Sequence, residues 1–90
     1  MEFEFDENKR LANIEAHGID FIDAGILFDN PYLEAPAKTV GDEQRWLAVG
    51  MIDDVYVTAV FVRRGPVIRI ISMRRARNDE RKKHQQIFGG

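Results

Sequence analysis

Hydrophobic residues recur with two different periods in the first third of the chain. Phe3 and Phe5 alternate with acidic residues, and this period of two indicates a short strand. Apolar residues at helical spacing then predict a helix over residues 7–17. Asp6 stands where a side chain can cap the first turn, and Gly18 supplies the left-handed residue that ends such a helix.

A second helix is expected to begin at Asp20, because apolar residues again recur at helical spacing, and to end at Asp29-Asn30-Pro31. Residues 32–39 follow one proline and contain another, which favours an edge strand or an irregular loop.

Alternating and continuous apolar runs predict three further strands over residues 43–51, 55–63 and 67–73. The turns between them are short, as in an antiparallel meander. A last helix is expected over residues 77–88. The pattern therefore predicts an α+β fold: a small antiparallel sheet, a three-to-four-stranded meander, with two N-terminal helices packed on it and a C-terminal helix.

The 90 residues are enough for one domain, spanning residues 1–90. The absence of cysteine excludes disulfides and thiolate chemistry. No signal peptide or membrane-spanning segment is recognisable, so we expect a cytoplasmic protein without a membrane partner. No glycine-rich nucleotide loop, nucleophile elbow or acidic metal cluster is present, and we expect no cofactor and no metal site.

Charge is distributed unevenly, although the formal net charge is only −2. Residues 1–62 hold four Lys and Arg against thirteen Asp and Glu, whereas residues 63–90 hold nine against two. Such a basic end suggests a surface that meets a polyanion. The alternative is internal neutralisation, with acidic helices lying beside basic strands.

Arginines stand out on the last predicted strand and just after it. Strict alternation places Arg69 on the same side as Val67, Ile71 and Met73, where a charge needs an Asp or Glu partner from a helix or a position at the mouth of a groove. The nearby arginines suit phosphate, because a guanidinium donates two hydrogen bonds and stays ionised; a solvated helix start is the alternative. They are Arg74, Arg75 and Arg77.

Arg45 and Trp46 lie on a neighbouring predicted strand. Arg45 and Arg69 can point from one face only if the strand register allows it, and the sequence does not determine that register. Trp46 is better explained as a core residue than as a platform for stacking bases.

Two histidines are candidates for proton transfer near neutral pH. His17 closes the first helix, where it can also interact with the helix dipole, and shares one helix face with Lys9 and Asn13. That polar stripe can equally be a solvent face. His84 lies among basic residues of the last helix.

The combined motifs resemble one known family over nearly the whole chain. The opening segment has the form F-D-x-x-K-x-x-x-N-x-x-x-H-G-I-x-F over residues 5–21, and the closing segment reads R-I-I-S-M-R-R-A over residues 69–76. Between them stand Phe28-Asp29-x-Pro31, Glu43-x-Arg45-Trp46 and Gly50. This pattern resembles the BrnT family of bacterial type II toxins.

The resemblance implies a fold like that of the RelE and ParE toxins and a ribonuclease activity that arrests translation. It also implies a BrnA-type antitoxin as partner, with operator DNA bound only through the toxin–antitoxin complex. Two departures are visible: His84 stands near where an aromatic residue, often tyrosine, is expected, and Met73 replaces a small residue.

These expectations combine into a hypothesis of RNA cleavage without metal. Phosphate binding and transition-state charge are assigned to Arg45, Arg69 and Arg74, and proton transfer to His17 or His84. RNA binding is assigned to Lys9, Arg75, Arg77 and His84. The alternative is a non-catalytic or degenerate module that binds an antitoxin or nucleic acid through the basic end.

Overall fold

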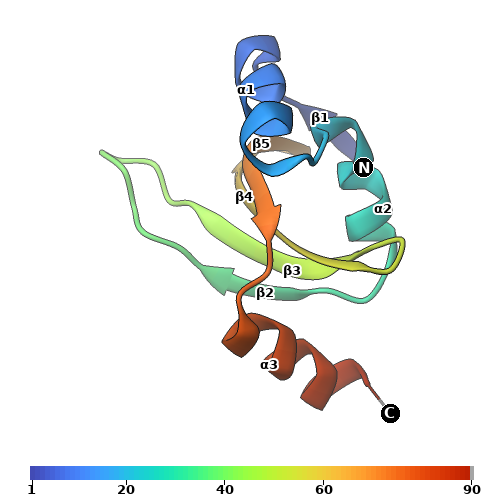
Figure 1. Ribbon diagram of the computed structural model, residues 1–90. Helices are drawn as coiled ribbons and strands as arrows, with labels where there is room; N and C mark the ends of the chain where they lie inside the picture. The colour runs from blue at the N-terminus through green and yellow to red at the C-terminus, as the bar shows by residue number, and fades with distance from the viewer. Residues whose placement is uncertain (90) are drawn as a thin grey trace.

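The computed structural model describes residues 1–89, and Figure 1 shows the arrangement of its elements. The strands are β1 (Glu2–Glu4), β2 (Leu33–Pro36), β3 (Trp46–Ile52), β4 (Val55–Arg64) and β5 (Val67–Arg75). The helices are α1 (Glu7–His17), a 3₁₀ turn η1 (Phe21–Asp23), α2 (Ala24–Asp29) and α3 (Asn78–Phe88). The predicted α+β class and element order are confirmed.

The strands form one five-stranded sheet in the order β1-β5-β4-β3-β2. Strands β2 to β5 make the predicted antiparallel meander, with the proline-flanked β2 at the edge. The short β1 pairs with β5 in parallel, at the other edge. The N-terminal strand therefore joins the sheet next to the last strand.

Helix α1 begins and ends as its sequence predicts. The Asp6 carboxylate accepts a hydrogen bond from the Lys9 backbone N–H at 3.1 Å, and Gly18 adopts φ 67° at the C-cap. The helix is attached to β5 through the buried Asn13. Its side-chain Nδ2 donates to the Met73 carbonyl oxygen at 2.9 Å, and its Oδ1 accepts from the Met73 N–H at 3.1 Å. Because β1 pairs with β5 only as far as Arg69, Asn13 satisfies backbone groups that would otherwise lack a partner.

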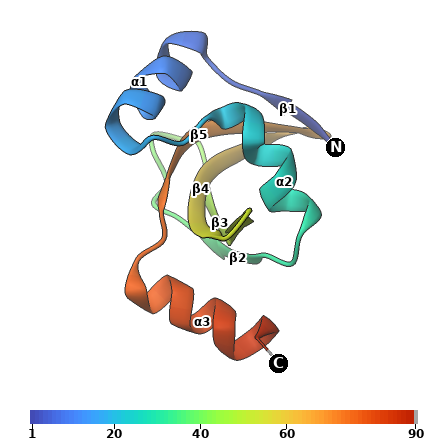
Figure 2. The ribbon, with the colours of Figure 1, turned by 45° about the vertical axis from the view of Figure 1, so that its right-hand side comes forward.

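The core lies on the side of the sheet that packs against α2, which we call the inner face. Figure 2 shows the sheet curling around α2. Its fully buried residues come from η1, α2 and the central strands: Phe21, Leu27, Ala59, Phe61, Ile70 and Met73 are among them. Helix α1 lies against β5, and α2 against β3, so the two N-terminal helices cover the sheet from different positions.

A β-bulge overturns one sequence expectation. Val60 pairs with Ser72 and Phe61 with Ile70, so Ile71 is an extra residue in β5. The alternation shifts there, and Met73 points into the core while Arg69 points to the opposite side. The prediction that Arg69 and Met73 share a face is therefore wrong.

The side opposite α2 is called the outer face. Helix α3 crosses only part of it, beside β3, with His84 as its one buried residue in the described part of the chain. None of the helices described here is long and apolar enough to cross a membrane.

Candidate functional site

Three arginines assigned to catalysis by the sequence lie together on the outer face. In the register, Arg69 is opposite Val62 and Arg74 is opposite Thr58. Arg45 extends β3 by one residue, because its carbonyl oxygen accepts from the Ala37 N–H at 2.8 Å. Alternation from Trp46, which faces inward, turns Arg45 outward. We call Arg45, Arg69 and Arg74, together with Arg64 at the end of β4, the arginine face.

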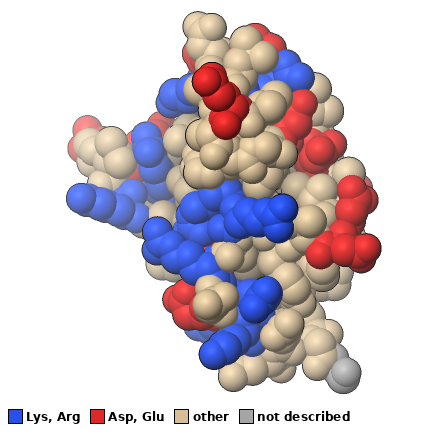
Figure 3. Space-filling view, viewed as in Figure 1, with Lys and Arg blue, Asp and Glu red and all other residues tan. Residues whose placement is uncertain are grey.

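The four arginines give this face a positive charge. In Figure 3 the blue side chains gather across the middle of the molecule, over the central strands and between α1 and α3. Between these arginines the outer face is apolar, with Leu47, Val60 and Val62 as its floor. A low-polarity floor strengthens the attraction of the guanidinium groups for an anion.

Arg45 is the least satisfied of these arginines. Its side chain is 26% exposed, and its Nε is buried without a hydrogen-bond partner in residues 1–89. The nearest carboxylate oxygen, from Glu43, is 3.8 Å away, beyond hydrogen-bond distance. Glu43 also lies 3.5 Å from Arg64. A buried donor of this kind has an unmet capacity for an acceptor.

Arg69 is loosely paired. Its Nη1 lies 3.6 Å from the Glu4 carboxylate, which β1 places directly opposite in the register. The side chain is 26% exposed, so the guanidinium is reachable from solvent. An acidic partner is thus present, but it comes from strand β1 and not from a helix as expected, and the contact leaves most of the guanidinium donors free.

Arg74 is firmly paired instead. Its two terminal nitrogens donate to both oxygens of Glu80 at 2.8 and 3.0 Å. The Thr58 hydroxyl and the Arg77 backbone N–H also donate to this carboxylate. These bonds, with that from Arg74 the strongest, lower the pKa of Glu80 to about 2, against the opposing effect of burial.

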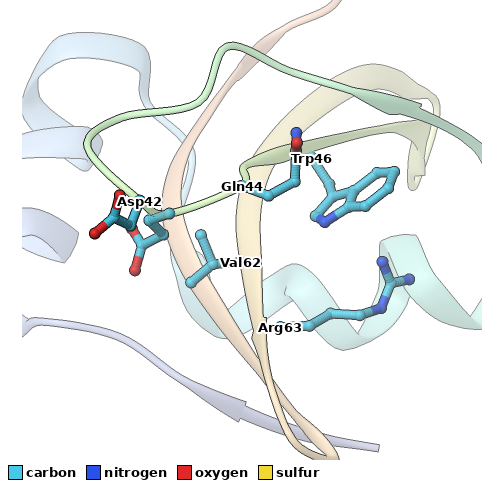
Figure 4. Close-up of a pocket in the computed structure, with 6 residues that line it drawn as sticks. Asp42, Gln44, Trp46, Val62 and Arg63 are labelled. Atoms are coloured by element: carbon cyan, nitrogen blue, oxygen red, sulfur yellow. The ribbon is translucent and has the colours of Figure 1, made fainter.

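A hollow of about 540 Å³ lies next to the arginine face, where β3 begins and β4 ends. Residues 42–44 of the preceding loop line it, together with Trp46, Val62 and Arg63. Figure 4 shows the indole of Trp46 and the guanidinium of Arg63 side by side, and the Arg63 Cζ lies 5.6 Å from the ring centroid. Trp46 also packs against the core, as predicted, but it is only partly buried.

The structure does not bring His17 to the arginine face. His17 lines a separate hollow of about 170 Å³ with Arg75, Asp53 and inward-facing residues such as Val57. Arg75 alternates with Arg74, and therefore points to the opposite side of β5. The proposed pairing of His17 with the three arginines finds no support in this geometry.

His84, assigned to proton transfer or RNA binding from the sequence, is buried. Its Nε2 lies 2.9 Å from the Pro31 carbonyl oxygen, and its ring packs against Tyr56 and Phe88. The imidazole thus helps to hold α3 to β4 and to the loop before β2. Arg77 is the N-cap residue of α3, and Lys9 is exposed on α1.

Sequence analysis missed three residues with clear roles. Glu80 was not recognised as the partner of Arg74, although Thr58, a polar residue inside an apolar strand, signals a buried hydrogen-bonding group nearby. The polar stripe of α1, open to a functional or a solvent interpretation, did not indicate that Asn13 bridges α1 and β5. Arg63, beside Trp46, is held by Glu34 through two hydrogen bonds.

The comparison with protein-family models gives one match. Residues 5–80 match the family described as the ribonuclease toxin BrnT of type II toxin–antitoxin systems. No curated protein matches the chain. The matched range spans most of the chain, including Arg45, Arg69, Arg74 and Glu80. The chain therefore belongs to the BrnT family of ribonuclease toxins of type II toxin–antitoxin systems.

Proposed function

We propose that this toxin cleaves RNA on its arginine face without a metal ion, and that a BrnA-type antitoxin neutralises it. The observation that supports this most directly is the placement of three partly buried arginines, Arg45, Arg69 and Arg74, on one face that α3 leaves largely uncovered. Two of them hold no bidentate carboxylate within residues 1–89.

The chemistry needs only groups that the chain itself can supply. The RNA 2′-oxygen attacks the adjacent phosphorus, a proton leaves the 2′-hydroxyl, and the bond from phosphorus to the 5′-oxygen breaks. The 5′-oxygen gains a proton, and the products are a 2′,3′-cyclic phosphate and a 5′-hydroxyl. The arginines stabilise the charge that builds on the phosphorane oxygens, the type of term that contributes most to many enzymatic rates.

The test is cleavage of single-stranded RNA by purified protein in EDTA, with and without the co-expressed antitoxin. We expect cleavage that EDTA does not abolish and that the antitoxin does. Cleavage that requires added metal would contradict the metal-free mechanism. Salt-dependent RNA binding with no cleavage would favour the alternative, a non-catalytic module that uses the same arginines to bind.

Glu43 is better placed than His17 to accept the 2′-hydroxyl proton. Its carboxylate is partly exposed on the arginine face and bound only at long distance by Arg45 and Arg64. We expect Glu43→Gln to slow RNA cleavage by about 10²-fold, within the usual range for general base catalysis, and His17→Asn to change it little. The measurement is single-turnover cleavage of a defined RNA. The reverse order of effects would return the proton-transfer role to His17.

The antitoxin can inhibit by covering the arginine face with acidic side chains. Charge complementarity of this kind increases association rates and weakens with salt. An antitoxin segment that supplies carboxylates to Arg45 and Arg69 would compete directly with RNA phosphates for the same donors.

A further inference from the structure

We propose that the hollow beside Trp46 binds one unpaired nucleobase of the RNA whose backbone lies on the arginine face. This inference rests on the proposed function and adds a base-selecting subsite to it. The hollow is open to solvent and lies within the range of about 300–1,000 Å³ that is usual for small-molecule sites.

The hollow offers two planar groups that bind bases. The Trp46 indole is partly exposed, and the Arg63 guanidinium lies against it. Bases of single-stranded RNA stack on aromatic rings and on guanidinium planes, largely regardless of sequence. The Glu34 carboxylate holds Arg63 in place, which reduces the entropy that this platform loses on binding.

The hollow lies at the end of the sheet, where Trp46 and Arg63 point to the inner face and Val62 points to the arginine face. Glu43 lines the hollow and contacts both Arg45 and Arg64. Val62 also lines it and is opposite Arg69 in the sheet register. An RNA strand that passes over this end of the sheet can therefore contact Arg45 and Arg64 with a phosphate and place a neighbouring base in the hollow.

The charges of the hollow suit a base better than a second phosphate. Asp42 and Glu43 repel phosphate from its loop side. The Asp42 carboxylate is exposed and accepts no hydrogen bond from residues 1–89, so its oxygens are available to a ligand. Carboxylates accept hydrogen bonds from exocyclic amino groups such as cytosine N4. Uracil carries no amino group, and its single N3–H donor lies between two carbonyl oxygens that a carboxylate repels, so the hollow should prefer cytosine, adenine or guanine over uracil.

Trp46 is the only tryptophan in the sequence and reports directly on this hollow. The probes are 2′-O-methyl oligonucleotides of equal length, which cannot be cleaved: oligo-C, oligo-U and an abasic strand that keeps every phosphate. We expect all three to bind with salt dependence by anisotropy. Oligo-C should quench Trp46 fluorescence, and should bind about tenfold more tightly than oligo-U. The abasic strand should bind without quenching.

Equal quenching by the abasic strand, or none by oligo-C, would overturn the proposal. Asp42→Asn is expected to remove the preference for oligo-C over oligo-U while leaving phosphate-driven binding. The matched control is Asp54→Asn, which removes the same charge from the turn between β3 and β4 and should keep the preference. If Asp42→Asn keeps the preference for oligo-C over oligo-U, that result would also contradict the proposal.

Failure of this inference is distinguishable from failure of the proposed function. Cleavage of ordinary RNA in EDTA without any base-dependent quenching would support the ribonuclease mechanism and contradict base binding in the hollow. Base-dependent quenching in a protein that does not cut RNA would have the opposite meaning. The hollow would then bind a base, but the protein would be a non-catalytic binding module.

Discussion

Replacing Arg69 with alanine is expected to slow RNA cleavage by about 10²–10³-fold, the usual effect of removing one well-placed group that stabilises transition-state charge. Arg69 is central on the arginine face, and its 3.6 Å contact with Glu4 leaves most of its donors free for phosphate oxygens. The loss should appear in the single-turnover rate at saturating RNA, because the interaction strengthens as the phosphorane forms.

The matched control is Arg81→Ala, which removes one positive charge from the exposed side of α3. It should change RNA affinity only modestly and leave the single-turnover rate near that of the unmodified protein. Arg69→Lys keeps the charge but not the planar fork, so we expect partial activity. Full activity of a folded Arg69→Ala protein would remove Arg69 from the catalytic assignment, and equal losses in Arg69→Ala and Arg81→Ala would indicate a general electrostatic effect.

Features of the fold that depend on neighbouring residues could be predicted from the sequence. Asp6 and Gly18 mark the ends of α1 because a cap and a left-handed stop act over one turn. The three long strands follow from their apolar runs and from the turns between them. The order of helices and strands and the antiparallel meander could therefore be predicted, because each depends on signals within a short segment.

Features that depend on pairing between distant segments could not be predicted. The bulge at Ile71 reverses which side chains of β5 face the core, and no local pattern marks it. Strict alternation consequently placed Arg69 with Met73. The parallel pairing of β1 with β5, which brings Glu4 to Arg69, is likewise a long-range choice.

The candidate site shows the same division. The arginines were found from the sequence because their residue type and clustering carry the signal, and the family motif reinforced it. Which of them share a face required the register. His17 and Arg75 line a hollow on the other side of β5, and His84 is buried under α3. Their positions depend on how α1, β5 and α3 pack together, which the sequence pattern does not give.

Glu80→Gln is the second large effect, and it concerns stability. Glu80 accepts hydrogen bonds from Arg74, Thr58 and the Arg77 backbone, and its side chain is only 13% exposed. Its pKa is lowered from 4.5 to about 2, with the Arg74 hydrogen bond as the largest cause. Because the folded state holds this carboxylate in its ionised form, the stabilisation is complete above about pH 4.5 and is lost as the pH falls toward 2.

At neutral pH we expect Glu80→Gln to lower the free energy of unfolding by about 2–3 kcal/mol, after allowance for solvent around the partly exposed pair. Urea denaturation from pH 7 to pH 2 provides the measurement. The unmodified protein should lose this increment below pH 4.5, so the two stability curves should converge in acid. Asp79→Asn, one residue earlier on α3 and exposed, is the matched control and should keep the acid-dependent increment. Parallel curves for Glu80→Gln and the unmodified protein would show that the link between Arg74 and Glu80 does not stabilise the docking of α3. Convergence would show that this link, together with the contacts of His84, fixes α3 beside the arginine face.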